Sequence, residues 1–327
     1  MSRTRVRALV RDGERFLVTC HRRPDADALG SALGWAAILR ALGKEAVVYS
    51  VDPPPRMLRF LPGIDAVRRE PPEDRRWDAA FVMDAAAEAL VPPMPTSLAG
   101  PVVMFDHHAA HDDFGDVVLR EPDACATGLL VVRVMRELGL SEVPPAAIAP
   151  LYAAIVADTG GFRYDGTGPE VLRLAAELVG AGAEPWTTAY HLFEGWHPAR
   201  MRLLGAILDG MSMVLDDRVA VLTVTRAMLA RTGADGEMVE GMVNYGRMLE
   251  GVEIAVLLWE LERAGGPETK VSLRSSGRAD VSPIAAALDG GGHRAAAGAN
   301  VRAPIDATRD RVLALAADVL DDPSFGG

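Results

Sequence analysis

Acidic and imidazole side chains follow several apolar runs of this sequence. Buried strands of an open α/β sheet deliver polar groups at their carboxyl ends, where such folds place their sites. The groups are Asp106-His107-His108 after run 101–105, His21 after 16–20, Asp84 after 79–83 and Asp158 after 151–157. Four repetitions of this pattern are hard to explain by packing, so together they predict one shared polar site.

The residue types at these positions are those that bind divalent cations. His21 and Asp25 are four residues apart on one loop, because Pro24 blocks a helix there, and Asp27 follows two residues later. Mixed imidazole and carboxylate ligands favour Mn²⁺ over Mg²⁺, with Co²⁺ or iron as further candidates. The expected metal ligands are His21, Asp25, Asp27, Asp84, His107 and Asp158.

Two cations in such a site would perform phosphoryl chemistry. A pair about 3.5–4 Å apart clamps the attacking and leaving oxygens and lowers the pKa of a shared water molecule. We expect Asp84 to bridge the two ions. Each residue also has a purely structural alternative: His21 as a core histidine, Asp25, Asp27 or Asp84 as helix caps, and Asp158 as part of a turn. One metal site would explain all of them together.

The elements that must position these groups alternate between strands and helices, which is typical of a parallel sheet. Expected strands of the first half cover 15–20, 46–51, 79–83 and 102–105, and expected helices cover 28–42, 127–139, 146–157, 168–182 and 185–209. The second half shows strands at 219–225, 254–260 and 271–274 and helices at 236–250 and 305–320. We expect an α/β fold, with an N-terminal parallel sheet covered by helices on both faces and a smaller C-terminal α/β domain.

Composition limits the class of protein and its partners. The net charge of −11 over 327 residues lacks the basic footprint of proteins that bind long nucleic acid, whereas a nucleotide or short oligonucleotide fits. No apolar stretch reaches the roughly 18 residues that span a membrane, and the N-terminus shows no signal peptide. Cys20 and Cys125 fit no disulfide or metal spacing, which indicates a reduced, cytoplasmic protein. Trp186, Trp196 and Trp259 are expected to be packing residues.

The motifs together resemble the DHH phosphoesterase superfamily, in its short two-domain branch of nanoRNases and 3′-phosphoadenosine 5′-phosphate phosphatases. The N-terminal motifs are His21-Arg-Arg-Pro-Asp25-Ala-Asp27, Val82-Met-Asp84, Asp106-His107-His108 and Asp158-Thr-Gly160. Arg274-Ser-Ser276 and Gly290-Gly-Gly-His293 are similar to the DHHA1 domain that accompanies it. The resemblance covers nearly the whole chain, and we expect a catalytic domain over 1–195, a helical linker over 196–215 and a substrate-binding domain over 216–327.

The resemblance implies a role for each matching residue. His21, Asp25 and Asp84 would hold one manganese ion, and Asp27, Asp84, His107 and Asp158 the other. The catalytic set is His108, which approaches the scissile phosphate, Asp106, which orients a histidine, and Asp84. The substrate-binding set is Arg274, Ser275, Ser276, Gly291, Gly292 and His293. Relatives also suggest a homodimer.

The expected activity is hydrolysis of oligoribonucleotides of two to five units to mononucleotides. A 3′-phosphoadenosine 5′-phosphate phosphatase and a linear or cyclic dinucleotide phosphodiesterase remain alternatives, since the same metals serve all three. A non-catalytic nucleotide sensor is a third. Departures from the family pattern are Asp289 in place of a first glycine, Leu129 where many relatives carry Glu, and His111, expected to be a solvated loop residue.

Overall fold

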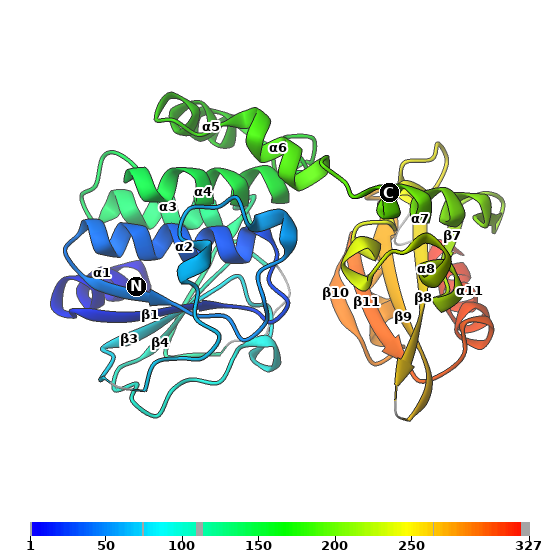
Figure 1. The fold of residues 1–327 in the computed structure, drawn as a ribbon, viewed down its shortest axis with the longest axis horizontal. Coiled ribbons are helices and arrows are strands. Elements are labelled where there is room, and N and C mark those ends of the chain that lie inside the picture. Colours follow the sequence, from blue (N-terminus) through cyan, green and yellow to red (C-terminus); the bar gives the residue numbers. More distant parts are fainter. Residues whose placement is uncertain (1, 74, 109–113, 264, 322–327) are drawn as a thin grey trace. The chain divides into compact units, whose positions relative to one another are not determined.

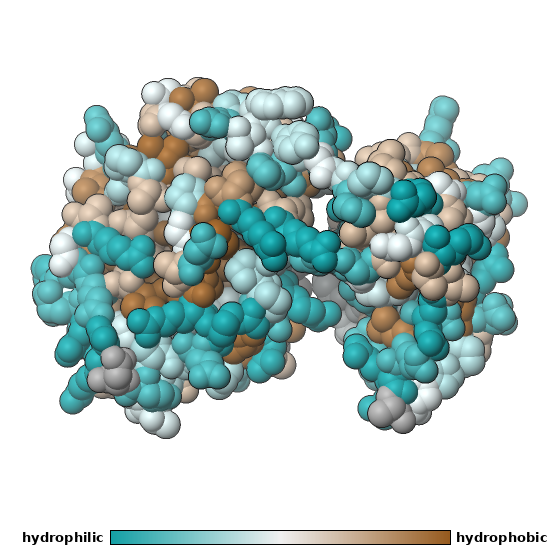
Figure 2. All heavy atoms as spheres, viewed as in Figure 1, coloured by the Kyte–Doolittle hydropathy of each residue, from teal (hydrophilic) through white to brown (hydrophobic). Residues whose placement is uncertain are grey.

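The computed structural model describes residues 2–321 except 74, 109–113 and 264. The chain divides into two compact units, Met1–Gly195 and Trp196–Gly327. Hydrophilic and apolar residues are interspersed on the visible face of each unit (Figure 2). No helix among the described residues is long and apolar enough to cross a membrane.

A five-stranded parallel sheet forms the middle of the first unit (Figure 1). In spatial order its strands are β2 Glu45–Val48, β1 Arg15–Cys20, β3 Ala79–Met83, β4 Val102–Asp106 and β5 Val117–Arg120. The register pairs Cys20 with Met83 and Met83 with Phe105, so the strands end at a common level. The residues that follow β1, β3 and β4 are thereby brought to one edge of the sheet.

One face of this sheet carries the helices of the first unit. Phe16, Phe81 and Phe105 point to this face. Phe81 and Phe105 contact Trp35 and each other, and Phe16 contacts Phe81, with ring centroids 5.2–5.8 Å apart. Burial of these large rings contributes several kcal/mol at about 25 cal/mol per Å². The helices are α1 Ser2–Asp12, α2 Ala26–Ala41, α3 Thr127–Glu137, α4 Pro145–Asp158, α5 Pro169–Gly180 and α6 Pro185–Phe193.

The opposite face is covered by irregular chain, which corrects the expectation of helices on both faces. Leu17, Ala80 and Met104 point to this side, and residues such as Trp77 and Phe114 pack against them. The described segments on this side hold only the short 3₁₀ helix η3 Glu88–Leu90, because η1 Arg56–Leu58 and η2 Ile64–Ala66 bury Leu58 and Ile64 in the core of the helix-covered face. Apolar residues on both faces of a strand predict that both faces are buried, but they do not predict what buries them. The expected α/β class itself is confirmed.

The second unit is built on a six-stranded mixed sheet. In spatial order its strands are β10 Gly291–His293, β11 Ala296–Val301, β9 Gly266–Ser275, β8 Ile254–Arg263, β7 Val219–Val224 and β6 Ser212–Val214. Only β7 and β8 pair in parallel among these. Helices α10 Ser282–Ala286 and α11 Ile305–Asp321 pack on one face. On the other lie α7 Pro198–Asp209, α8 Arg226–Thr232, η4 Gly236–Val239 and α9 Asn244–Arg247.

Three details of the second unit differ from the sequence expectations. Helix α7 lies within the stretch expected to be a linker, yet its Leu203 and Ile207 are buried in the core of this unit. The expected helix over 236–250 is replaced by η4 and α9, with Gly241 at φ +79° between them. The hairpin of β10 and β11 lies outside the expected strands, because its alanine and glycine residues carry little strand signal.

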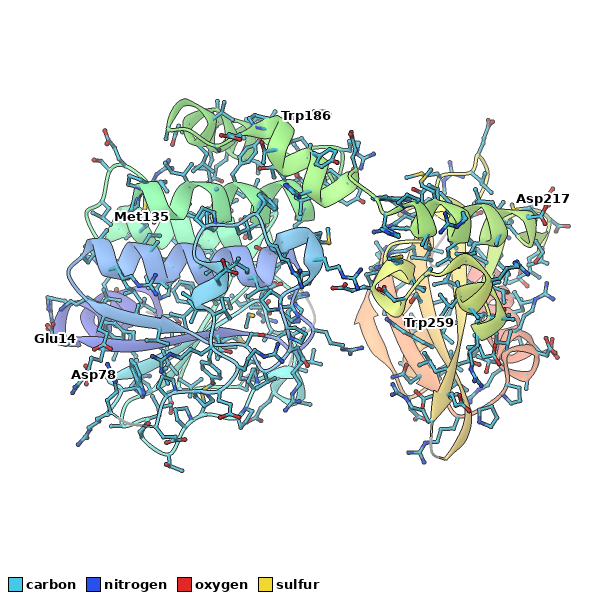
Figure 3. The ribbon with its side chains drawn as sticks, in the orientation of Figure 1. Glu14, Asp78, Met135, Trp186, Asp217 and Trp259 are labelled. Atoms are coloured by element: carbon cyan, nitrogen blue, oxygen red, sulfur yellow. The ribbon has the colours of Figure 1, made fainter. Side chains whose placement is uncertain are left out.

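The three tryptophans for which a packing role was expected, among the five of the chain, do not share one environment. Trp196 and Trp259 pack against the core of the second unit, as expected. Trp186 is 69% exposed and stands on α6 of the first unit (Figure 3), so its expected packing role is wrong. A tryptophan predicts burial only when it falls on the apolar face of its helix, and Trp186 does not.

Candidate metal centre

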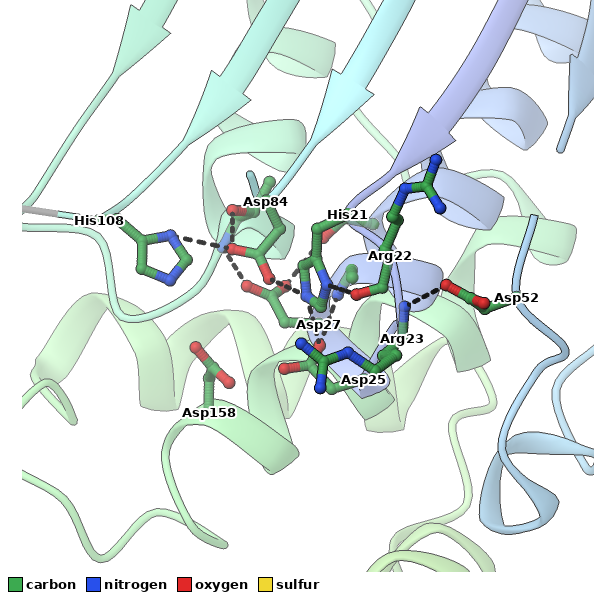
Figure 4. Close-up of polar contacts among 12 residues, drawn as sticks. His21, Arg22, Arg23, Asp25, Asp27, Asp52, Asp84, His108 and Asp158 are labelled. Atoms are coloured by element: carbon green, nitrogen blue, oxygen red, sulfur yellow. Dashed lines mark hydrogen bonds and ion pairs between the residues drawn. The ribbon is translucent and has the colours of Figure 1, made fainter. Parts of the chain in front are cut away.

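The expected metal ligands of the first unit converge at the carboxyl edge of the parallel sheet (Figure 4). His21 and Asp25 lie between β1 and α2, and Asp27 lies in the first turn of α2. Asp84 follows β3, His107 follows β4, and Asp158 is the last residue of α4. The topology therefore brings together residues that are as many as 137 positions apart, from His21 to Asp158.

One group of candidate ligands surrounds His21. Its Nε2 atom lies 3.7 Å from Asp84 Oδ2 and 3.9 Å from Asp25 Oδ1. These separations exceed hydrogen-bonding distance, and they leave room for a cation that binds all three atoms. Asp25 also caps α2, because its Oδ1 accepts from Ala28 N at 3.0 Å. The cap and the ligand are thus roles that one carboxylate can combine.

A second group surrounds His107. Its Nε2 atom lies 3.1 Å from Asp158 Oδ2, 3.7 Å from Asp27 Oδ2 and 3.5 Å from Asp84 Oδ1. Asp84 therefore turns one carboxylate oxygen toward each group, Oδ2 toward His21 and Oδ1 toward His107. A bridging carboxylate between two cations needs this arrangement.

The backbone of Asp84 is unusual in a way that suits this position. Its φ is +57°, in the left-handed region where only glycine is at ease, although aspartate tolerates it better than most residues. The Asp84 amide donates to Phe105 O at 2.8 Å, and the Thr127 hydroxyl donates to Asp84 Oδ1 at 3.1 Å. Strained backbone held by its surroundings is concentrated at functional sites.

Each histidine of the two groups has one ring nitrogen fixed by a backbone carbonyl. His21 Nδ1 lies 2.8 Å from Arg22 O, and His107 Nδ1 lies 3.2 Å from Ala124 O. A carbonyl oxygen only accepts, so Nδ1 carries the proton in both rings. Nε2 of the neutral ring is then the lone-pair nitrogen, and it is the atom that faces the carboxylates.

The buried carboxylate of Asp27 is held by the first turn of α3. Its Oδ2 accepts from Thr127 N at 2.6 Å, and its Oδ1 accepts from Gly128 N at 3.0 Å and from Ser31 Oγ at 2.8 Å. The positive end of α3 thus faces an acid 100 residues earlier in the chain. Because Oδ1 already has two donors, Oδ2 is the oxygen left to bind a cation. Sequence reasoning missed Ser31, which lies one helical turn after Asp27, and gave no role to Thr127.

His108 and Asp106 form a separate pair beside the two groups. His108 Nδ1 donates to Asp106 Oδ1 at 2.6 Å and lies 3.5 Å from Asp84 Oδ1. Burial would raise the pKa of Asp106, but the hydrogen bonds and charge of His108, together with His107, outweigh it and hold that pKa below the usual value. Burial likewise opposes protonation of His108, but Asp106 and Asp84 raise its pKa above the usual value. The pair therefore stabilises a positive imidazole.

The charges of the two groups of candidate ligands suit the binding of a cation. Burial is the largest cause that raises the pKa of Asp27 to about 7 and those of Asp84 and Asp158 to about 6, and the neighbouring carboxylates raise all three further. Burial opposes protonation of His107, yet the hydrogen bond to Asp158 and the facing carboxylates raise its pKa to about 11. Buried carboxylates that repel one another, beside imidazoles whose Nε2 atoms face them, are the donor set of a divalent metal site.

The expected substrate residues gather at one end of β9 and on the hairpin of the second unit. Arg274 of β9 and His293 of β10 are both in register with Ala296 of β11. Ser276 is exposed, whereas the buried Ser275 hydroxyl donates to Ala279 O at 2.7 Å and accepts from Gly277 N at 3.0 Å. Ser275 therefore shapes a turn, and its hydroxyl is already occupied.

The glycines of the hairpin meet different steric demands. Gly292 has a φ of +143°, and a Cβ there would overlap the backbone of Ala297. A Cβ on Gly291 would meet nothing within 4 Å, so Gly291 is free of that constraint. Asp289, at the first place of the run, has a φ of +58°. Leu129, the other departure, is buried in the core of the first unit. The side chain of His293 and the whole of His111 lie outside the described residues.

Comparison with known proteins identifies both units. Residues 15–157 match the DHH family, N-terminal domain, and residues 216–322 match the DHHA1 domain. The chain is 36% identical over 309 residues to the bifunctional oligoribonuclease and PAP phosphatase NrnA of Thermus thermophilus, covering 92% of this chain and 89% of that one. It is 26% identical to the Bacillus subtilis protein of the same name, over 90% and 91% of the two chains.

A solved structure has the same fold. The exopolyphosphatase-related protein from Bacteroides fragilis superposes with a TM-score of 0.87 at 23% sequence identity, covering 97% of this chain and 95% of that one.

Proposed function

This chain belongs to the DHH family of phosphoesterases and ends in a DHHA1 domain, and from that premise we propose that it hydrolyses very short oligoribonucleotides to mononucleotides with two manganese ions. The names of the Thermus and Bacillus relatives support the substrate class. The observation that carries the proposal is the placement of Asp84 between two groups of ligands, with one oxygen for each.

We assign the ligands by these two groups. His21, Asp25 and Asp84 would hold one ion, and Asp27, Asp84, His107 and Asp158 would hold the other. When bound, the two cations supply positive charge that activates a water molecule and offsets the charge of the phosphate. The mixture of imidazole and carboxylate donors favours Mn²⁺, while Mg²⁺ and Co²⁺ are the alternatives to compare.

The residues beside the ions have supporting roles in this proposal. His108 is held as a cation by Asp106 and balances negative charge that develops on the phosphoryl oxygens or the leaving oxygen. Asp106 fixes the His108 ring through Nδ1, which leaves Nε2 for the substrate. Removing such a charge-stabilising group typically costs about 10²–10³ in rate.

The DHHA1 unit would hold the rest of the substrate. The Arg274 guanidinium, whose Nη1 donates to Leu273 O at 2.9 Å, supplies positive charge for a phosphate, and Ser276 is exposed beside it. The amides of Gly291 and Gly292 can approach an anion because no side chain stands in the way. His293 is proposed as the remaining contact. The net charge of −11 makes a substrate of a few nucleotides more favourable than a long strand.

Phosphatase activity on 3′-phosphoadenosine 5′-phosphate is the second candidate function. The names of both relatives combine the two activities, and the same metal ligands serve a phosphomonoester and a phosphodiester. A linear or cyclic dinucleotide phosphodiesterase uses them equally. A non-catalytic nucleotide sensor is less well supported, because every ligand of both proposed ions is present.

A substrate panel tests the proposal and separates these candidates. Specificity constants would be measured for a ribonucleotide dimer, pentamer and 24-mer, a cyclic dinucleotide and 3′-phosphoadenosine 5′-phosphate, each with Mn²⁺ and with Mg²⁺. We expect the dimer with Mn²⁺ to give the highest kcat/KM and the 24-mer the lowest. Equal rates on dimer and 24-mer would contradict the length preference.

The Asp84→Ala variant tests the metal mechanism itself. We expect it to lose at least about 10³-fold in kcat because both ions lose a ligand. Far-ultraviolet circular dichroism serves as the control that the fold is retained. Full activity in this variant with Mn²⁺ would contradict the two-metal mechanism.

A further inference from the structure

The loop that supplies His21 and Asp25 to the proposed first ion contains a residue with a strained backbone, as Asp84 has after β3. Arg23 lies between His21 and Asp25, two residues from each, and its φ is +55°. Arginine has a Cβ and no side-chain acceptor near its own backbone, so the left-handed region costs it free energy. Something outside the loop must therefore hold it in this shape.

The partner that holds it is Asp52. The Arg23 amide donates to Asp52 Oδ2 at 2.8 Å, a charge-assisted hydrogen bond (Figure 4). Asp52 follows β2, the strand next to β1, and its own carbonyl accepts from the Ser50 hydroxyl at 3.0 Å. Ser50 is buried, and its amide donates to Arg68 O at 2.8 Å. The acceptor is thus anchored to the sheet independently of the loop that it holds.

The strained residue is directly connected to the ligands. The His21 ring hydrogen-bonds Arg22 O, the carbonyl of the peptide unit whose amide is that of Arg23. One peptide unit therefore joins the His21 ring on one side to Asp52 on the other. If the left-handed turn relaxes, this peptide unit rotates, and the His21 ring loses its orientation toward Asp84.

From these contacts we propose that Asp52 is a positioning residue for the first metal ion. By holding Arg23 in the left-handed conformation, it fixes His21 and Asp25 at the places from which they face Asp84. The inference rests on the metal binding in the proposed function, and it assigns Asp52 no contact with an ion or with substrate.

Manganese titration of the metal-stripped full-length chain tests the proposal. We expect Asp52→Ala to weaken one of the two ions by about tenfold and to leave the other within about twofold, because strained backbone costs on the order of one such factor. Asp52→Asn retains an oxygen that accepts from the Arg23 amide, so we expect its affinities to lie within about threefold of the wild-type values.

Substitution of Arg23 separates positioning from a general structural effect. Glycine adopts a φ of +55° without strain, so Asp52→Ala combined with Arg23→Gly should recover most of the lost affinity. Asp52→Ala combined with Arg23→Ala removes the same side chain but keeps the strain, and it should recover none. Rescue by glycine alone is a result that simple loss of stability would not produce.

Asp78→Ala is the matched control at the other end of β1. Asp78 Oδ2 accepts from the amides of Glu14 and Arg15 at 2.8 and 2.9 Å, so it also links a carboxylate to the backbone of a neighbouring segment. Its removal should lower the melting temperature and leave both manganese affinities unchanged.

The outcomes distinguish the inference from the proposed function. A wild-type chain that binds fewer than two Mn²⁺ ions overturns the proposed function, and with it the premise of the inference. A wild-type chain that binds two ions, with Asp52→Ala binding both equally well, overturns the inference alone. So does a glycine double variant that binds no better than the alanine one.

Discussion

At the level of single residues, the proposed metal centre is defined by which side-chain atoms are already engaged in hydrogen bonds and which are left to face a cation. Asp27 has two donors on Oδ1 and one on Oδ2, so only one oxygen is left to face His107. Asp84 divides its oxygens between two histidines. His21 and His107 each use Nδ1 for a hydrogen bond to a backbone carbonyl. Ligand type alone would have allowed several other arrangements of the same side chains.

The first prediction at this scale concerns Asp106. Asp106→Asn removes the negative charge that raises the pKa of His108, so that pKa falls in the variant. We expect kcat to drop about 10²-fold or more at neutral pH. The alkaline limb of the kcat profile should also move to lower pH, because the positive ring is lost earlier as pH rises. The pH dependence of kcat with saturating Mn²⁺ measures both effects.

The control for this prediction is a variant that leaves the charge in place. Asp106→Glu retains a carboxylate, so its profile should keep the wild-type alkaline limb even if its rate is reduced. An Asp106→Asn profile with an unmoved alkaline limb would show that His108 does not act as a cation.

A second prediction follows from the raised pKa values of the buried carboxylates. Burial and the neighbouring Asp84 raise the pKa of Asp27 from 3.8 to about 7 in the folded metal-free chain, so this group lowers stability as pH rises from 3.8 to 7, and the loss is complete above pH 7. A bound cation offsets that repulsion. We expect Mn²⁺ to raise the melting temperature more at pH 8 than at pH 5.5, as measured by calorimetry.

The Asp27→Asn variant, measured by the same calorimetry, is the control for this prediction. Asp27→Asn has no charge to ionise, so the difference between the two pH values should shrink in that variant. An equal manganese-induced shift at pH 8 and pH 5.5 in the wild type would contradict the role given to these carboxylates.

At the scale of elements, close contact between helices sets the width of the centre. Helices α2 and α4 approach closely at two glycines, since a Cβ on Gly30 would overlap Pro150 O and one on Gly34 would overlap the Leu151 side chain. Asp27 lies in α2 and Asp158 ends α4, so the spacing of these helices also sets the spacing of two proposed ligands. The packing of small residues thus serves the site as well as the core.

Glycine-to-alanine substitutions test this arrangement. Gly30→Ala should destabilise the chain by about 1–3 kcal/mol, because the new methyl group forces α2 and α4 apart. It should also weaken Mn²⁺ binding. Gly205 is the matched control in α7, where an added Cβ meets nothing within 4 Å. Gly205→Ala should stabilise by about 0.5–1 kcal/mol and leave Mn²⁺ binding unchanged, as measured by urea denaturation and metal titration.

At the scale of the whole molecule, the chemistry and the proposed substrate contacts belong to separate units. The proposed ligands all lie within Met1–Gly195, and the substrate residues lie within Trp196–Gly327. Each unit has a hydrophobic core formed from its own residues. Separate cores allow each unit to fold by itself, which makes the division of labour testable.

Truncation after Gly195 tests that division. The first unit alone should still bind two Mn²⁺ ions and hydrolyse a small activated phosphodiester such as bis-p-nitrophenyl phosphate. Its kcat/KM on a ribonucleotide dimer should fall by at least about 10²-fold, because the contacts that hold the substrate are gone. A truncated chain with full kcat/KM on the dimer would show that the DHHA1 unit is dispensable for substrate binding.

Local signals in the sequence are enough to predict the α/β class, most strands and helices of the first unit and the residue types of the site. Apolar runs and the polar groups that follow them are local signals, so strands such as 79–83 and residues such as Asp84 can be found without coordinates. The family motifs added the candidate roles. The irregular segments that cover the other face of the parallel sheet carry no comparable local signal in the sequence.

How the ligands are divided and held depends on contacts between distant parts of the chain. Thr127 and Gly128 meet Asp27 across about a hundred residues, and Asp52 meets Arg23 across neighbouring strands. A hydrogen bond between distant segments depends on how strands and helices pack, and no local pattern in either segment encodes it. For the same reason, the two oxygens of Asp84 could be assigned to His21 and His107 only once the strand ends lay side by side.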